Sequence, residues 1–109
     1  ASDVYKRQLL GDAPVLWPTA ATNLNSGPYD NANMAPFNKA LLAARDRYPN
    51  LIVYDWASDV RPEWFLPGDD VHYQTEGNEK RAEYFAKALT LAFPTDGSAP
   101  DDQIVTVDK

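Results

Sequence analysis

The sequence predicts an α/β fold in which two buried, parallel strands are joined by a helix. Two short apolar runs, Pro14-Val15-Leu16-Trp17-Pro18 and Leu51-Ile52-Val53-Tyr54, have the composition of strands covered on both faces of a sheet. Between them, apolar side chains recur at helical spacing over residues 33–48. A strand, a helix and a second buried strand form a βαβ unit, whose strands are parallel and whose crossover is almost always right-handed.

The composition is that of one modest globular domain. The chain has 109 residues, of which 44% are hydrophobic and 12% aromatic, too many for a disordered chain. Sixteen acidic and ten basic residues give a net charge of −6, which argues against nucleic acid or an anionic membrane surface as the main partner. The absence of cysteine excludes disulfides and thiolate metal sites. No apolar run is long enough to cross a bilayer, and the sequence itself does not indicate a cellular compartment.

The two ends of the chain differ from its middle. Asp3-Val4-Tyr5-Lys6-Arg7-Gln8 is the peptide that one reading frame of a common sequencing-library transposon end encodes, so we expect residues 1–8 to be adapter-derived rather than a natural polar arm. Residues 9–93 then begin inside a domain. Residues 94–109 are polar and acidic, and we expect a disordered tail there, with residues 104–107 as the only candidate for an edge strand.

The first predicted strand leads through a loop into the first helix. Residues 19–33 are rich in Asn, Gly, Pro and Ser, which fits either a plain connector or a surface binding loop. We expect the helix to start with Asn33 as its N-cap, to hold Pro36 in its first turn and to end at Pro49-Asn50. Its apolar stripe consists of Met34, Phe37, Leu41, Ala44 and Tyr48.

A second helix follows and should pack on the sheet. Either Gln74 or Thr75 caps it, and Thr75 is the better cap by residue type. Glu76 and Lys80, and likewise Glu83 and Lys87, have the i,i+4 spacing of favourable ion pairs. The predicted packing face consists of Ala82, Phe85, Ala86, Leu89 and Phe93.

The loop before this helix contains the candidate catalytic residues. It contains two carboxylates and the only histidine, in the order Asp69, Asp70, His72. Histidine takes up and returns protons near neutral pH, and an acid three residues earlier can reach one ring nitrogen across a turn. A hydrogen bond from the ring to Asp69 would fix the tautomer and leave the other nitrogen of His72 to deprotonate a hydroxyl, which is the base half of a catalytic triad.

Other interpretations of the same loop stay open. A histidine near a helix start often only caps or packs. Asp69, Asp70 and His72 are all possible metal ligands, although zinc would need a further well-placed side chain and no other histidine or cysteine exists. A glycosidase pair of carboxylates is a weaker alternative, because adjacent residues seldom face each other across a sugar.

Several segments together resemble the C-terminal end of an SGNH-type (GDSL-like) hydrolase domain, in the form fused to bacterial membrane acyltransferases that O-acylate cell-surface glycans. The resemblance covers roughly residues 14–93. Asn38 also matches the family's asparagine-containing helix. The segments that carry the resemblance are Val53-Tyr54-Asp55-Trp56-Ala57, Trp64-Phe65, and Gly68-Asp69-Asp70-Val71-His72-Tyr73-Gln74-Thr75-Glu76-Gly77.

The resemblance implies a fold and a set of roles. The fold is the C-terminal half of a three-layer α/β/α, flavodoxin-like domain with a parallel sheet. The Asp-x-x-His block assigns the triad acid to Asp69 and the triad base to His72. The implied substrates are an acyl donor and a glycan or small ester, the implied location is the extracytoplasmic face of a bacterial membrane, and no metal or organic cofactor is implied.

The departures from the family concern both the loop and the nucleophile. Asp70 stands where members often have glycine, and Gln74-Thr75 replaces a Thr-Pro pair. The family's nucleophilic serine lies in an upstream Gly-Asp-Ser block. Here Gly11-Asp12 is followed by Ala13, and Ser26 and Ser58 lack the surrounding block. We therefore expect a fragment of a serine acyl-transfer enzyme that is inactive alone.

A function of another class is also compatible with the sequence. The loop from Trp17 to Asn33, together with Trp56, Trp64, Phe65 and Tyr73, could form a non-catalytic surface that binds a glycan or a protein. Aromatic residues of this kind more often belong to a core. The upstream reading frame discriminates the enzyme from the binding domain. A Gly-Asp-Ser block there supports the enzyme, and its absence from a complete domain supports the binding domain.

Overall fold

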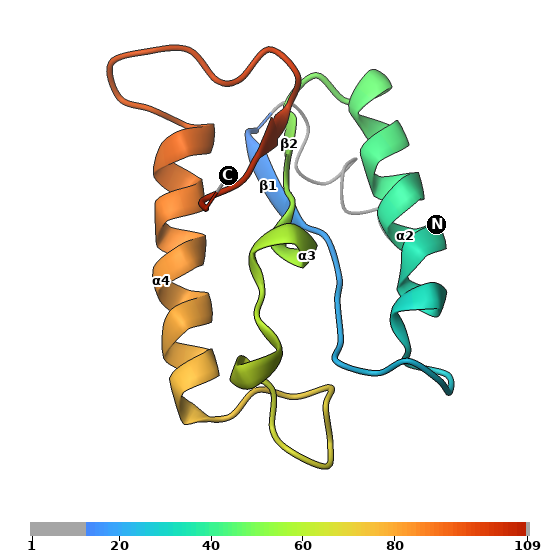
Figure 1. The fold of residues 1–109 in the computed structure, drawn as a ribbon. Coiled ribbons are helices and arrows are strands. Elements are labelled where there is room, and N and C mark those ends of the chain that lie inside the picture. Colours follow the sequence, from blue (N-terminus) through green and yellow to red (C-terminus); the bar gives the residue numbers. More distant parts are fainter. Residues whose placement is uncertain (1–12, 109) are drawn as a thin grey trace.

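The computed structural model describes residues 13–108; the predicted adapter-derived segment 1–8 and residues 9–12 lie outside it. Figure 1 shows a small sheet between two long helices. The elements, in chain order, are β1 (Val15–Pro18), α2 (Asn31–Ala43), the 3₁₀ turn η1 (Ala44–Asp46), β2 (Leu51–Tyr54), α3 (Trp56–Asp59), the 3₁₀ turn η2 (Pro62–Trp64), α4 (Thr75–Ala92) and β3 (Ile104–Val105). The predicted α/β class is confirmed.

The sheet is parallel and has the order β1-β2-β3, so β2 is central. Val15 of β1 pairs with Leu51 of β2, and Val53 of β2 pairs with Ile104 of β3. All four residues of β2 are buried, as its uniform apolar sequence predicts for a strand with a neighbour on each side.

Each face of the sheet has its own helix and its own core cluster. Ile52 and Tyr54 of β2 point to the side of α4, whereas Leu51 and Val53 point to the side of α2. This alternation is the period-2 geometry of a strand. Figure 1 shows the same arrangement, with α2 and α4 on opposite sides of the strands.

The two crossovers of this sheet have opposite hands. Both β1-α2-β2 and β2-α4-β3 move the chain in the same direction across the sheet, but their helices lie on opposite faces. Two crossovers that have the same handedness and advance in the same direction across a sheet place their helices on the same face. One of the two is therefore an exception to the right-handed rule. The β2-to-β3 connection is the less constrained, because β3 contributes only two residues.

Helix α2 begins three residues earlier than predicted. The N-cap is Asp30, whose side chain accepts a hydrogen bond from the backbone N–H of Asn33, and Asn33 itself lies inside the helix. Asp is as good a cap as Asn, so residue type alone could not choose between them. Pro36 consequently lies in the second turn, not in the first.

Helix α4 begins where predicted, and two residues of its predicted face, Phe85 and Phe93, pack against the core on this side of the sheet. Its cap is Gln74, whose side chain accepts a hydrogen bond from the N–H of Glu76 over 2.6 Å; Thr75 is the first helical residue. Of the predicted face, Leu89 is 49% exposed. Lys80 lies 3.9 Å from Glu83, not beside Glu76. The buried residues of α4 are Gly77, Tyr84, Ala88 and Ala92.

The segment after α4, for which the composition predicts a disordered tail, contains the short strand β3 at the position of the candidate edge strand. The backbone N–H groups of Val107 and Asp108 donate to the carboxylate of Asp59, which is only 3% exposed and also accepts from the Tyr54 hydroxyl. A buried carboxylate with three donors is stable only when all three stay in place, so Asp59 anchors this segment.

Candidate active site

The loop that carries His72 is closed at its base by backbone hydrogen bonds. The N–H of Gln74 donates to the carbonyl of Trp64 over 3.1 Å, and the N–H of Leu66 donates to the carbonyl of His72 over 2.8 Å. Phe65 and Tyr73 pair between these two bonds as an antiparallel bridge. These contacts turn residues 64–74 into a stem with a short tip.

Asp69 and His72 meet at this tip, as the spacing predicts. Nδ1 of His72 lies 3.1 Å from Oδ2 and 3.2 Å from Oδ1 of Asp69. The Asp69 carboxylate also accepts from the backbone N–H groups of Val71, over 2.8 Å, and of His72, over 2.6 Å. The His72 side chain is 79% exposed, so its ring is open to an incoming group.

The charge on Asp69 determines the tautomer of His72. The backbone N–H groups of His72 and Val71, followed by the His72 ring, lower the pKa of Asp69 to about 2. The carboxylate is therefore ionised at neutral pH and can only accept a hydrogen bond. Nδ1 of His72 must carry the proton that it shares, which leaves Nε2 as the basic nitrogen of the neutral ring.

Asp70 holds the tip of the loop against the segment that follows β1. Its φ of 58° lies in the left-handed region, which favours glycine but which aspartate also adopts. The backbone N–H of Asn23 donates to the carbonyl of Asp70 over 2.8 Å, and the Asn23 side chain donates to the Asp70 carboxylate over 3.2 Å. Both observations explain how aspartate is accommodated at this left-handed position of the loop.

The start of α4 lies directly against the stem. A Cβ on Gly77 would stand 2.0 Å from the carbonyl oxygen of Trp64, so only glycine permits this approach. The sequence marks Gly77 as part of the loop motif, but nothing in it indicates the close packing with Trp64.

The aromatic residues around the loop belong to the core. Trp56, Trp64 and Phe65 are 2–3% exposed. The indoles of Trp56 and Trp64 stack with centroids 5.9 Å apart, and the indole N–H of Trp56 donates to the Tyr73 hydroxyl over 3.0 Å. Trp56 and Trp64 therefore support the loop as part of the core and form no exposed binding face, whereas Phe65 also lines a cavity.

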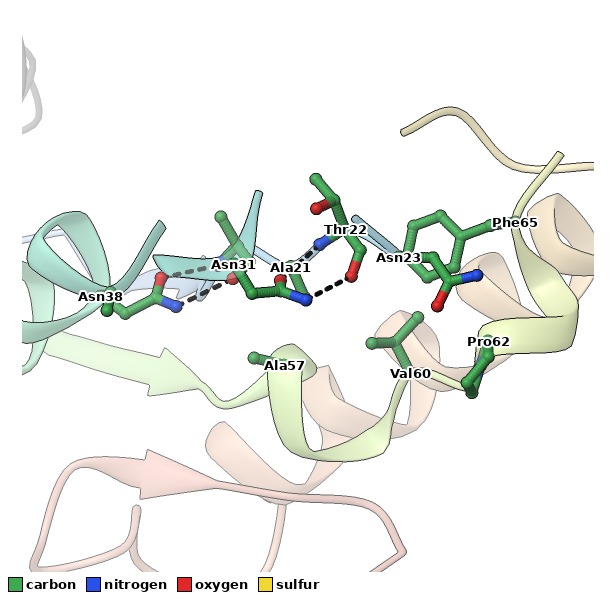
Figure 2. A pocket seen from close by; sticks show the side chains of 11 residues that line it. Ala21, Thr22, Asn23, Asn31, Asn38, Ala57, Val60, Pro62 and Phe65 are labelled. Atoms are coloured by element: carbon green, nitrogen blue, oxygen red, sulfur yellow. Dashed lines mark hydrogen bonds between the residues drawn. The ribbon is translucent and has the colours of Figure 1, made fainter. Parts of the chain in front are cut away.

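A cavity of about 350 Å³ lies beside the loop, beyond the carboxyl ends of β1 and β2 (Figure 2). Ligands of parallel α/β sheets bind in this position. One wall is the segment after β1, the second is the N-terminal half of α2, and the third is the α3–η2 stretch with Phe65. The lining residues are Ala20, Ala21, Thr22, Asn23, Asn31, Ala35, Asn38, Ala57, Val60, Pro62 and Phe65.

Asp55, directly after β2, accepts hydrogen bonds from two hydroxyl groups. The Ser58 hydroxyl donates to the Asp55 carboxylate over 2.5 Å, and the Thr19 hydroxyl donates to the other oxygen of Asp55 over 3.0 Å. The Thr19 bond ties the end of β1 to the end of β2, and the Ser58 bond is local to the start of α3. Within residues 13–108, no three acidic or histidine side chains gather in a group able to hold a metal ion.

Comparisons of the chain with known protein families, with curated proteins and with solved structures found no match. None of the helices in the described part of the chain is both long enough and apolar enough to span a membrane.

Proposed function

We propose that this chain is the C-terminal part of an SGNH-type domain that transfers or hydrolyses an O-linked acyl group through a serine ester. In this proposal, His72 is the general base and then the general acid, and Asp69 orients it. The contact of 3.1 Å between Nδ1 of His72 and the Asp69 carboxylate, on a loop that follows a parallel strand, carries the proposal.

The mechanism follows from the protonation states. With Nδ1 bonded to an ionised carboxylate, Nε2 accepts the proton of the attacking hydroxyl, and Asp69 stabilises the resulting imidazolium. The same nitrogen then returns the proton to the leaving alcohol. The serine and the oxyanion donors would come from upstream of residue 14, and the substrates would be an acyl donor and a glycan or a small ester, with a glycan hydroxyl or water accepting the acyl group.

The test uses the complete domain, recovered with its upstream reading frame. A Gly-Asp-Ser block in that frame is the first expected result. With p-nitrophenyl acetate as substrate, we expect His72→Ala to reduce turnover by at least about 10³-fold and Asp69→Asn to reduce it strongly through the wrong tautomer. Asp70→Gly is the matched control in the same loop and should be mild, because glycine adopts the same φ.

Two results would refute this proposal. Turnover by His72→Ala at close to the unmodified rate would remove the base role. A complete domain without a serine block would favour a non-catalytic binding function instead. The present chain alone should show no histidine-dependent hydrolysis of an activated acetyl ester.

A further inference from the structure

The cavity beside the loop has an uncharged lining. None of its 11 residues is acidic or basic. The lining therefore offers an ion no partner of opposite charge. This favours a neutral occupant.

The polar groups in the walls are already engaged with each other. The Asn38 side chain donates to the carbonyl of Ala20 and accepts from its N–H, both over 2.8 Å. The Asn31 side chain makes the same pair of bonds with Thr22, over 2.7 and 2.8 Å, as Figure 2 shows. These amides fix the wall instead of facing a ligand.

The surface that remains is mostly apolar and small. Four of the lining residues are alanines, and Val60, Pro62 and Phe65 complete the apolar part. A volume of about 350 Å³ is at the lower end for ligand pockets, but it is larger than an acetyl group needs.

The cavity is joined to the loop on both sides of His72. Asn23 lines the cavity and bonds to Asp70, two residues before His72. Phe65 lines the cavity and pairs with Tyr73, directly after His72. A group in the cavity therefore lies next to the segment that positions the proposed base.

We infer that this cavity binds an uncharged, apolar group of the substrate, namely an alkyl or acyl chain longer than acetyl. That this group belongs to a substrate rests on the proposed function. Asn31 and Asn38 act as positioning residues of the cavity wall, and Asn23 couples the wall to the loop of Asp69 and His72.

The experiment is an NMR titration of the whole ¹⁵N-labelled chain with ethyl butyrate. We expect saturable shifts of the backbone amides of residues 20–23 and of the side-chain amides of Asn31 and Asn38. Butyrate and methyl glucoside test charge and polarity, and each should bind at least tenfold more weakly than ethyl butyrate.

Matched variants decide whether binding occurs in the cavity. Ala35→Leu, on the α2 wall, should abolish the shifts, and Ala40→Leu, at an exposed position of α2 outside the cavity, should leave them unchanged. If Ala35→Leu loses the dispersed spectrum of the parent chain, Ala21→Leu fills the cavity from the opposite wall.

The outcomes separate the two proposals, because binding is measured without turnover. Absent shifts, unchanged binding by the filled variant, or stronger binding of methyl glucoside or butyrate would overturn the cavity assignment, even if the complete domain shows His72-dependent turnover. Saturable binding of ethyl butyrate that Ala35→Leu abolishes supports the assignment. If such binding accompanies turnover that is independent of His72, the proposed function fails alone and the cavity remains a site for a neutral apolar group.

Discussion

The two faces of the sheet are packed in different ways. On the α4 face, the helix buries four residues, and the rings of Tyr54, Trp56 and Trp64 fill the space below it. On the α2 face, none of the thirteen helical residues is buried, and Phe37 is 46% exposed. The two faces therefore have different roles. The tightly packed α4 face supports the His72 loop, and the loosely packed α2 face bounds the cavity.

The largest expected contrast comes from making the same change on both helices. Phe85 lies with its ring centroid 5.2 Å from Tyr54 and 5.5 Å from Trp56, so Phe85→Ala should lower the free energy of unfolding by about 3 kcal/mol. Phe37→Ala, the matched control on α2, should change it by less than about 0.5 kcal/mol. Urea unfolding measures both. Equal losses would contradict the difference between the faces.

The close approach of α4 to the stem predicts the next effect. Gly77→Ala places a methyl group against the Trp64 carbonyl, and the helix must move away. After the gain of about 1 kcal/mol in helix propensity, we expect a net loss of about 2 kcal/mol. Gly97→Ala is the control, because the nearest atom to its new Cβ lies 3.7 Å away. A neutral Gly77→Ala would show that α4 does not depend on this contact.

The anchor on Asp59 predicts a somewhat smaller loss. Tyr54→Phe removes a buried donor, at 2.8 Å, from the Asp59 carboxylate and should cost about 1.5 kcal/mol. In this network, burial and the neighbouring Asp59 raise the pKa of Tyr54. Tyr84→Phe removes a hydroxyl bonded to Asp108, which is 37% exposed, and should cost less than Tyr54→Phe. Thermal unfolding compares them, and a larger loss for Tyr84→Phe would contradict the anchor.

The smallest effect concerns pH. Because the folded pKa of Asp69 is about 2, below the unfolded value of about 4, its stabilising contribution is full above pH 4 and is lost as the pH falls through 2. The carboxyl ¹³C signal of Asp69 should titrate near pH 2, and the amide signals of Val71 and His72 should follow it. In Asp69→Asn, these amide shifts should be absent. A midpoint near pH 4 would mean that the loop is not ordered in solution.

Features of the fold and of the candidate site that depend on local sequence patterns were predicted correctly. The bounds of β2, the parallel pairing of β1 with β2 and the contact between Asp69 and His72 all follow from residue type and spacing. The packing face of α4 was predicted in part: Phe85 and Phe93 pack against the core, but Leu89, which was expected inside, is 49% exposed. Rings from other elements fill much of the interior, and the buried residues of the helix itself are Gly77, Tyr84, Ala88 and Ala92.

The remaining errors have tertiary causes. The short strand β3 is held by Asp59 and by the Gln103 side chain, which donates to the carbonyls of Tyr48 and Leu51, contacts that no local pattern records. The cavity is equally non-local, because three separate segments line it. Asn38 was noted only for the family resemblance, and its bonds to Ala20 give it a physical role.

The closed stem of the His72 loop has a consequence for folding kinetics. Since bonds between Trp64 and Gln74 and between Leu66 and His72 join residues no more than ten positions apart, the search that brings Asp69 to His72 is local. Loops of about ten residues close in roughly 10–100 ns, far faster than parallel strands pair across long sequence separations. The acid and the base can thus meet early, before the sheet that later supports them has assembled.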